Sequence, residues 1–426
     1  MAGQSVTDGR GPALRTWLEM LLGGEVVAWR RLVAGNSRTT WSADVAAAGR
    51  TTALVVRVDT GDGPFSHTPL TLAREAAVYA ALAGRGVTLP HSYGFDEGLG
   101  ALALERAAGA PAWDGAVLDA LLGELAVLHS VDVGDLDGDW VATRAIEDLE
   151  LWAAIARHRV SPPSPLVEFA VEFLRQRSPG EPERLVVVHG DAGPGNVLWD
   201  GERITALLDW ELCHTGDPHD DLAFLTVRAA LHGIELSDFG ARARARYFTP
   251  SGRAPDARRL LFWQAVSLLR NLVTCLASVS SPVRGRDRLV HHMLIPALNR
   301  MLVDALARID GVVLAPPAPA PTPTPEATEL PGARVLGEIA GGFDEIIAVI
   351  DDDEPRQRAR RMRHLLAQLA ETMPLAPILQ AQERDDSAVP GEDTGAALAR
   401  LARSADRGLT MFPRAAALAR TPLAGL

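Results

Sequence analysis

The chain has 426 residues, of which 47% are hydrophobic; it exceeds one ordinary hydrophobic core, so we expect two or three domains. Its net charge of −12 argues against nucleic-acid binding, because neutralising phosphates requires a basic face. With two cysteines, no apolar run near the roughly 18 residues of a membrane span and no signal-peptide pattern at the N-terminus, we expect a cytoplasmic protein without a disulfide framework or a membrane partner.

The first part of the chain predicts a small lobe made mostly of strands. A short amphipathic helix is expected over residues 11–21, and helical spacing recurs over residues 70–82. The β-like runs, rich in Val, Thr and aromatic residues, are 25–33, 40–46, 52–58, 91–96 and 100–105. Several strands interrupted by one helix indicate an α+β lobe, which we assign to residues 1–109.

From residue 110 the pattern turns helical, except for a strand–loop–strand stretch over 185–209. The expected helices are 115–130, 146–158, 164–177, 219–232, 256–278 and 285–309. We therefore assign residues 110–312 to a larger, helical lobe.

The last part of the chain is set apart by a Pro-rich stretch, LAPPAPAPTPTPE, which is stiff and extended. We assign residues 313–330 to a linker and residues 331–426 to a helical C-terminal segment. Its expected helices are 332–350, 355–372, 394–405 and 412–420, with a polar gap over 381–393. This segment could dock on the preceding lobe, form a homodimer or bind a partner of the same pathway.

The stretch between Val186 and Asp209 carries the chemistry. A polar loop begins with His189 and Asp191 after an apolar strand, Asn196 follows five residues after Asp191, and Asp209 ends a second apolar strand. This is the pattern of a kinase-type phosphotransferase, in which one acid accepts the proton of the attacking hydroxyl. Asp209 and the amide of Asn196 suit Mg²⁺, a hard ion that prefers one or two carboxylates plus phosphate oxygens.

Three motifs resemble the aminoglycoside-phosphotransferase/choline-kinase-like superfamily: HGDAGPGN (189–196), LLDWE (207–211) and GDPHDDLAFL (216–225). The resemblance covers about residues 11–310 and implies a two-lobed, protein-kinase-like fold that binds ATP or GTP with Mg²⁺ and a small-molecule acceptor. It makes Asp191 the catalytic base and assigns Mg²⁺ to Asn196 and Asp209. Three further residues would brace the catalytic loop or cap the next helix: His189, Asp217 and Asp221.

The N-terminal lobe carries weaker motifs of the same kind. The loop around Ser37 lies between two strands, as does the phosphate-covering loop of such kinases, and the Ser37 hydroxyl could bind phosphate. The strand LVVRV places Arg57 where kinases have a phosphate-binding Lys, and Glu75 lies on the following helix as its ion-pair partner. The chain contains no lysine, so any kinase-like site must hold its phosphates with Arg.

The nucleotide base and the acceptor have fainter signals. By resemblance to the family's interlobe hinge, the carbonyl of Glu105 and the amide of Ala107 would bond the adenine edge. Candidate acceptor contacts near the loop are Trp210, Glu211 and His214, with Trp152 and Trp263 on neighbouring helices.

Three hypotheses for the function follow. The sequence around Arg57 and Glu75 resembles the branch of the superfamily associated with acyl-CoA dehydrogenases, which suggests a hydroxyacyl or similar metabolite as acceptor. An aminoglycoside or macrolide phosphotransferase is the enzymatic alternative, and acidic side chains crowding the acceptor site would favour the cationic aminoglycoside. A nucleotide-binding regulatory pseudokinase is the alternative from another class, against which the complete set Asp191, Asn196 and Asp209 argues.

Overall fold

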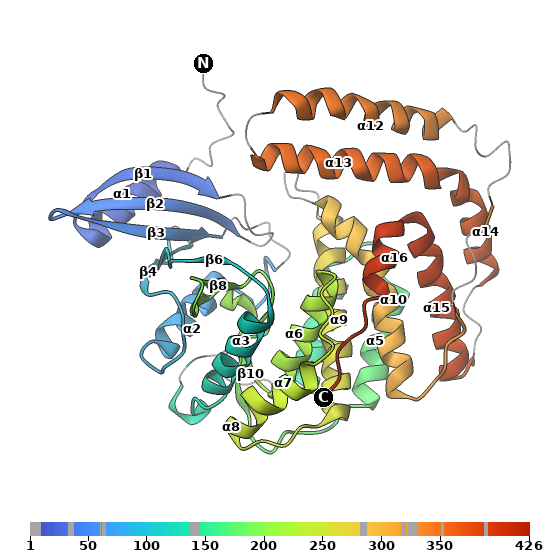
Figure 1. Cartoon of the computed structure of the whole chain (residues 1–426), viewed down its shortest axis with the longest axis horizontal. Coiled ribbons are helices and arrows are strands. Elements are labelled where there is room, and N and C mark those ends of the chain that lie inside the picture. Colours follow the sequence, from blue (N-terminus) through green and yellow to red (C-terminus); the bar gives the residue numbers. More distant parts are fainter. Residues whose placement is uncertain are drawn as a thin grey trace.

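The structure is a computed structural model that describes residues 10–32, 38–59, 61, 65–136, 138, 145–281, 288–316, 321–322, 331–350, 353–386 and 391–426. A β-rich lobe, in blue in Figure 1, adjoins a larger helical lobe, and further helices follow at the C-terminal end. The α+β, two-lobed fold expected from the sequence is therefore confirmed. Most of the expected linker 313–330 lies outside the described residues.

The N-terminal lobe is a five-stranded antiparallel sheet in the order β1-β2-β3-β5-β4. Its elements are α1 (Gly11–Leu22), β1 (Glu25–Leu32), β2 (Thr39–Ala47), β3 (Arg50–Val58), α2 (Leu72–Leu82), β4 (Ser92–Asp96) and β5 (Ala101–Glu105). They match the expected elements to within two residues at each end. Ala48 and Gly49, both with positive φ, form the two-residue β2–β3 turn, the hairpin geometry that suits the twist of the strands.

Strand alternation orients the functional side of this sheet. Leu54, Val56 and Val58 of β3 are fully buried in a cluster that includes Leu14 and Leu18 of α1. Because successive side chains of a strand point to opposite faces, Arg57 faces away from α1, toward α2 and the second lobe. The hydrophobic pattern of one strand thus fixes which way its arginine points.

The second lobe is built around α9 (Ala257–Ser280), which is in contact with helices α4, α5, α6 and α10. The expected helices are found as α3 (Gly115–Leu128), α4 (Ala145–Arg159), α5 (Pro165–Gln176), α6 (His219–Leu231), α9 and α10 (Arg288–Ile309). Short helical pieces that were not expected include α7 (Phe239–Ala243), a π-helical turn (Arg244–Phe248) and α8 (Thr249–Ser251).

Among the described residues, α9 is long and apolar enough to cross a membrane by length and composition. However, 78% of its most apolar stretch is buried inside the protein. It packs here as a core helix, which accounts for its composition.

Short strands of the second lobe hold the loop that carries the sequence motifs. Strand β7 (Val186–Val188) pairs with β10 (His214–Gly216), and β8 (Val197–Trp199) lies between β6 (Ala110–Pro111) and β9 (Ile204–Leu207). All three residues of β7 are fully buried, so the loop that follows it starts from a rigid strand.

The C-terminal segment comprises α12 (Pro331–Val349), α13 (Asp353–Thr372), α14 (Ala376–Asp385), α15 (Thr394–Met411) and α16 (Pro413–Ala419). Helices α15 and α16 pack on α10, where Arg300 forms two hydrogen bonds with Asp406, at 2.6 and 2.8 Å. Helices α12 and α13 form a hairpin at the top of Figure 1. Helix α14 was not expected, and it overlaps the beginning of the polar gap expected over 381–393. It extends to Asp385, where Glu383 accepts hydrogen bonds from Ser404 and Arg407 of α15.

Candidate active site

A single carboxylate, that of Asp221, holds the beginning of the loop after β7. Asp221, in the first turn of α6, accepts the backbone N–H groups of His189 and Gly190, both at 2.8 Å. The same carboxylate lies 3.0 Å from Nε2 of His129 on α3, whose other ring nitrogen lies 2.7 Å from the hydroxyl of Tyr247. These buried contacts tie the start of the loop to two helices, and they match the bracing position predicted for Asp221.

His189 and Gly190 shape the turn that presents Asp191. The Nδ1 atom of His189 accepts the backbone N–H of Asp191 at 3.2 Å, and its ring lies 4.3 Å from the ring of Trp210. Gly190 has φ +81°, and a Cβ there would lie 2.5 Å from the carbonyl oxygen of Leu212. Only glycine lets this loop lie so close to the segment after β9.

Asp191 lies in the interlobe region with its side chain 16% exposed. Burial raises the pKa of its carboxyl to about 6, an effect that Arg228 opposes and Asp209 strengthens. The Nε atom of Arg228, on α6, lies 3.4 Å from Oδ1 of Asp191. Sequence reasoning missed Arg228, although its position seven residues after Asp221 places the two on the same helix face.

Asn196 and Asp209 lie next to one another across β8 and β9. The side-chain amide of Asn196 donates to the backbone carbonyl of Asp191 at 3.0 Å, which leaves its amide oxygen for another partner. Its backbone carbonyl accepts the N–H of Leu208, the residue before Asp209, at 2.9 Å. Asp209 itself has φ +69°, a left-handed conformation that Asp tolerates better than most residues and that is concentrated at functional sites.

The donor set at this point fits a magnesium ion. One carboxylate and one amide oxygen are hard ligands, and Mg²⁺ commonly takes one or two carboxylates and completes its shell with phosphate oxygens and water. Within the described ranges, no group of three or more His, Cys, Asp or Glu side chains forms an all-protein metal cage. The two predicted ligands therefore suit an ion that a bound triphosphate helps to hold.

Arg57 joins the two lobes. Its guanidinium lies 3.0 Å from Glu75 of α2, 2.8 Å from Asp209 and 3.7 Å from Glu211. Burial raises the pKa of Glu75 to about 7 and that of Glu211 to about 8, although Arg57 lowers both. Burial would also raise the pKa of Asp209, but Arg57, with smaller contributions from His189 and Arg228, lowers it below its usual value.

A second arginine near the site, Arg74 of α2, was missed by the sequence analysis. Arg74 donates to the backbone carbonyl of Cys213 at 2.6 Å and to that of Glu211 at 3.3 Å. Since Arg74 and Glu75 are neighbours, α2 holds the segment after Asp209 with one residue and pairs with Arg57 through the next. The signal in the sequence was the Arg74-Glu75 pair itself, because Arg74 directly precedes the residue that was predicted to pair with Arg57.

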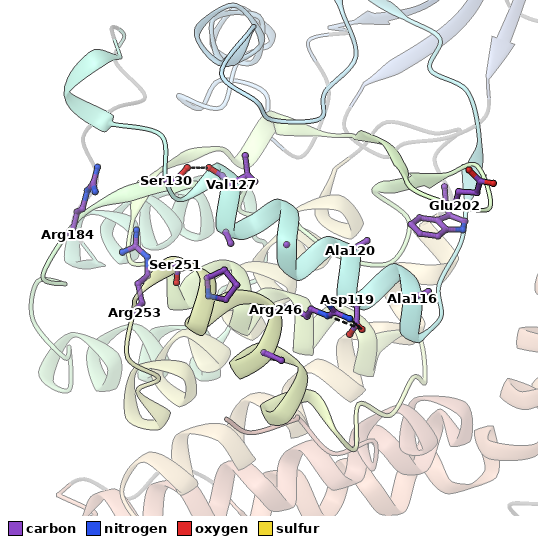
Figure 2. A pocket seen from close by; sticks show the side chains of 15 residues that line it. Ala116, Asp119, Ala120, Val127, Ser130, Arg184, Glu202, Arg246, Ser251 and Arg253 are labelled. Carbon is purple, nitrogen blue, oxygen red and sulfur yellow. Dashed lines mark hydrogen bonds and ion pairs between the residues drawn. The ribbon is translucent and has the colours of Figure 1, made fainter.

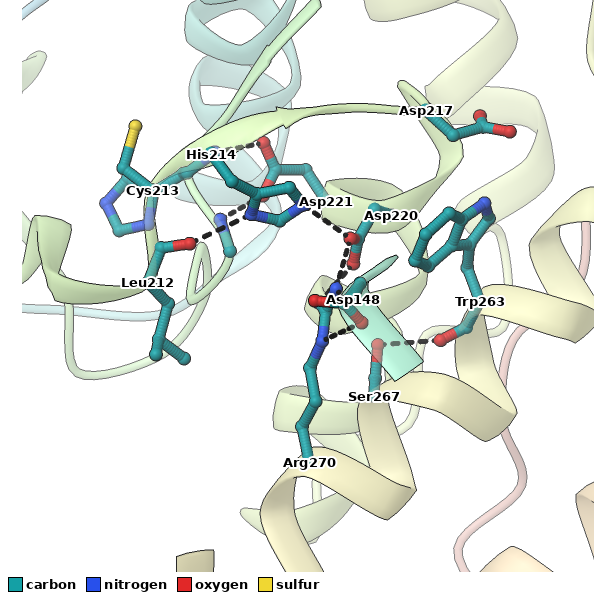
Figure 3. Close-up of polar contacts among 12 residues, drawn as sticks. Asp148, Leu212, Cys213, His214, Asp217, Asp220, Asp221, Trp263, Ser267 and Arg270 are labelled. Atoms are coloured by element: carbon teal, nitrogen blue, oxygen red, sulfur yellow. Dashed lines mark hydrogen bonds and ion pairs between the residues drawn. The ribbon is translucent and has the colours of Figure 1, made fainter. Parts of the chain in front are cut away.

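The prediction that Trp210 and His214 contact the acceptor is wrong, because both side chains are buried. Trp210 is fully buried, donates from Nε1 to the carbonyl of Leu207 and lies against His189, so it belongs to the core. His214 is buried between the carbonyl of Leu212 and the carboxylate of Asp220. Figure 3 shows this second contact continuing into a buried network, because Asp220 also binds Arg270.

The remaining acceptor candidates differ in accessibility. Trp152 and Trp263 are each only 2% exposed and pack in the core, which also removes them as contacts. Arg270 of α9 bridges Asp220 to Asp148 of α4 (Figure 3). Glu211 is buried as well, but it lies beside Arg57 at the metal side of the site.

Asp217 stabilises the beginning of α6 rather than the loop. Its Oδ1 accepts the backbone N–H of His219 and lies 2.9 Å from the ring Nδ1 of the same residue, and its Oδ2 accepts from Arg259 at 2.6 Å. The residue immediately before the helix is Pro218, so Asp217 acts one position earlier than an ordinary N-cap.

The predicted nucleotide-binding positions are only partly described. Ser37 lies outside the described residues. Glu105 is the last residue of β5, and Ala107 follows in the segment that leads to β6. Their backbone roles toward adenine stay predictions.

A groove of about 880 Å³ lies elsewhere, along the outer side of α3 (Figure 2). Asp119 and Arg246 line it as an ion pair, and Trp199 also lines it. None of the predicted site residues lines this groove, so it is separate from the candidate active site.

The fold and the site together define a kinase-like phosphotransferase. The sequence profile described as "Phosphotransferase enzyme family" matches residues 28–263, which is more than half of the chain. The protein therefore belongs to the phosphotransferase enzyme family, and it transfers a phosphoryl group to a hydroxyl of a small molecule. A search of curated proteins found no match.

Solved structures share the fold at low sequence identity. Choline kinase LicA from Streptococcus pneumoniae has a TM-score of 0.53 and 15% identity, over 70% of this chain and 98% of its own. Macrolide 2'-phosphotransferase MphH from Brachybacterium faecium has a TM-score of 0.46 and 21% identity, over 64% and 99%. A putative fructosamine-3-kinase from Thermobifida fusca has a TM-score of 0.45 and 21% identity, over 70% of this chain and 99% of its own.

Proposed function

We propose that the protein is a magnesium-dependent kinase that transfers the γ-phosphoryl group of ATP, or of GTP, to a hydroxyl of a small metabolite. Asp191 accepts the proton of the acceptor hydroxyl, and Asn196 and Asp209 hold Mg²⁺, which would neutralise charge on the triphosphate. The observation that carries this proposal is the buried Asp191 carboxylate, held on a braced loop beside Asn196 and Asp209.

On the nucleotide side, Arg57 replaces the kinase lysine. Its two terminal nitrogens contact Glu75 and Asp209 separately, so the side chain is aligned before any nucleotide enters. A planar guanidinium can then contact two phosphate oxygens side by side, which a single ammonium cannot do. The backbone of Glu105 and Ala107 would receive the base, and the loop that contains Ser37 would cover the phosphates.

For the acceptor we propose a neutral or anionic hydroxylated metabolite, such as a hydroxyacyl compound, rather than an aminoglycoside. The buried aspartates around the catalytic loop are already paired: Asp217 with Arg259, Asp220 with Arg270 and Asp221 with His129. Carboxylates that are neutralised in this way offer little attraction to a polycationic antibiotic. This supports the hydroxyacyl hypothesis drawn from the sequence around Arg57.

The test is phosphoryl transfer from ATP and from GTP to a panel of acceptors, with and without Mg²⁺. The panel holds hydroxyacyl-CoA esters, free hydroxy acids, aminoglycosides, macrolides, sugars and amino alcohols, and the Asp191→Ala protein serves as the blank. We expect turnover on a hydroxyacyl compound that is lost in the variant. Turnover restricted to an antibiotic would refute the acceptor, and nucleotide binding without turnover on any acceptor would favour the pseudokinase.

For the C-terminal segment we propose association with a second copy through α12. Four of the large hydrophobic residues exposed in the described chain recur at spacings of four, seven and three residues along this helix: Val335, Ile339, Ile346 and Val349. This is the a/d spacing of a helix seam, with only Gly342 at the intervening position. The seam is bordered by exposed Glu338 and Glu345, whereas α13 carries exposed Arg360 and Arg361, so two antiparallel copies would set acidic edges against basic ones.

Sedimentation equilibrium tests this association. We expect the wild type to be a dimer and Ile339→Glu to be a monomer, while Val313→Glu, a change at a residue that is 94% exposed and off the seam, stays dimeric. A wild type that is monomeric at about 100 µM would refute the proposal, since stable dimers persist well below that concentration.

A further inference from the structure

One face of α6 runs along the whole catalytic loop. Asp221, Leu225 and Arg228 lie on this face at spacings of four and seven residues. Asp221 holds the beginning of the loop through the N–H groups of His189 and Gly190. Two turns further on, Arg228 reaches the part of the loop that carries the reactive carboxylate.

Arg228 contacts the loop at two points. Its Nε lies 3.4 Å from Oδ1 of Asp191, and its Nη2 donates to the carbonyl of Pro194 at 3.4 Å. The first distance exceeds the usual 2.7–3.2 Å of an N–H···O bond, so the contact is an ion pair. Both Nε of Arg228 and Oδ1 of Asp191 are buried without a hydrogen-bond partner, and both therefore keep the capacity to bind a further group.

The loop is built to admit this arginine. A Cβ on Gly193 would lie 3.0 Å from Cβ of Arg228 and 3.4 Å from its Cγ. A Cβ on Gly195 would lie 3.7 Å from Nη2 of the same residue. Gly193 and Gly195, one on each side of Pro194, thus let the loop lie directly on the side chain of Arg228. A larger residue at position 193 would displace that side chain.

The charges around the loop leave a place for a second cation. Arg57 is shared among Glu75, Asp209 and Glu211 on the nucleotide side. Because the chain contains no lysine, a second permanently charged cation at the loop has to be an arginine as well. Arg228 reaches Asp191 from α6, on the other side of the loop from β3.

Building on the proposed function, we propose that Arg228 is a positioning residue of the phosphoryl transfer. Its guanidinium holds the Asp191 carboxylate toward the acceptor and offsets negative charge that gathers when the triphosphate enters. In the reaction, the acceptor O–H bond breaks and its proton passes to Asp191. The acceptor oxygen bonds the γ-phosphorus as the bond to the β–γ bridging oxygen breaks, and that electron pair leaves with the nucleoside diphosphate. Arg228 keeps its proton throughout.

The first test compares steady-state kinetics of Arg228→Met and Arg228→Lys with the wild type. We expect Arg228→Met to lower kcat about a hundredfold, the usual loss when one charge-stabilising donor is removed, with the KM for ATP within threefold. Arg228→Lys restores the positive charge, so its kcat should be at least tenfold higher than that of Arg228→Met. A kcat of Arg228→Met within threefold of the wild type, or a Lys variant no better than Met, would overturn the proposal.

Arg242→Met is the matched control, because Arg242 also forms interhelical ion pairs but with Asp119, away from the loop. Hydrogen–deuterium exchange of the loop peptide, measured without substrates, gives a second readout. We expect residues 189–196 to exchange faster in Arg228→Met than in Arg242→Met, and equal exchange would overturn the positioning role. If the wild type transfers nothing, the proposed function fails, while the exchange comparison still decides whether Arg228 holds the loop.

Discussion

The guanidinium of Arg57 lies 2.8 Å from the carboxylate of Asp209, so a residue of the N-terminal sheet contacts the proposed metal ligand of the second lobe directly. The same guanidinium lies 3.0 Å from Glu75 through its other terminal nitrogen. One side chain therefore links β3, α2 and the end of β9.

Replacing Arg57 with Lys tests this double contact. An ammonium is a single point of charge and cannot reach Glu75 and Asp209 in the way that two separate guanidinium nitrogens do. We expect Arg57→Lys to weaken Mg·ATP binding about tenfold, which corresponds to about 1.4 kcal/mol, by isothermal titration calorimetry. Arg50→Lys, at the exposed beginning of the same strand, should bind as the wild type does. Unchanged affinity in Arg57→Lys would contradict a bidentate role.

Asp191 should control the rate and its dependence on pH. Asp191→Asn keeps the size of the side chain but removes the proton acceptor, so we expect kcat to fall about a thousandfold with nucleotide binding nearly unchanged. Because burial raises the pKa of this carboxyl to about 6, the base becomes protonated as the pH falls through that value. The wild-type kcat should therefore decline below about pH 6, and a flat profile down to pH 5 would argue against Asp191 as the base.

The metal requirement should depend on Asp209. Asp209→Asn removes the one charged ligand of the proposed site, so we expect the Mg²⁺ concentration for half-maximal activity to rise about tenfold or more, consistent with the loss of a hard carboxylate ligand. Asp200→Asn, in the exposed β8–β9 connection, is the control with the same chemical change. An unaltered Mg²⁺ dependence in Asp209→Asn would place the metal elsewhere.

Asp217 should contribute stability that depends on pH. Burial alone would raise the pKa of this carboxyl, but hydrogen bonds from His219 and Arg259 lower it to about 2. A carboxyl whose pKa is lowered by folding stabilises the protein above its unfolded pKa of roughly 3.9, and this contribution is lost as the pH falls toward 2. We expect Asp217→Asn to cost about 2 kcal/mol in urea unfolding at pH 7, with the difference from wild type shrinking below pH 4. A difference that stays constant down to pH 3 would contradict this origin.

The sequence and the structure agree closely wherever a local pattern specifies the element. The five strands of the first lobe and the long helices of the second were predicted to within a few residues, because apolar periodicity reflects which face is buried. The contiguous helical run of α7, the π-helical turn and α8 escaped prediction, because the π-helical turn interrupts the 3.6-residue period on which the prediction depends. The helix α14 was not predicted at all, for a different reason: its polar residues are held by partners on α15.

Acceptor contacts were the weakest part of the sequence analysis. Trp210 and His214 follow Asp209 closely in the chain, which suggested that they face the substrate. In the structure Trp210 supports His189 from the core, and His214 is hydrogen-bonded into the Asp220–Arg270 network. Proximity in sequence to a reactive residue does not determine which way a side chain points when the chain turns sharply, as it does at Asp209.

By itself the sequence determined the class of chemistry, because Asp191, Asn196 and Asp209 stand at spacings that only a particular loop and strand pair can use. It also determined that phosphates must be held by arginine, since no lysine is present. The sequence already placed Arg57 at the predicted phosphate-binding position, but only the tertiary structure showed that Arg228 reaches the carboxylate of Asp191. Arg57 and Arg228 come from β3 and α6, 171 positions apart in sequence (228 − 57), and reach neighbouring carboxylates only because two lobes enclose one loop. Such convergence depends on how separate elements pack, which no local pattern of residues records.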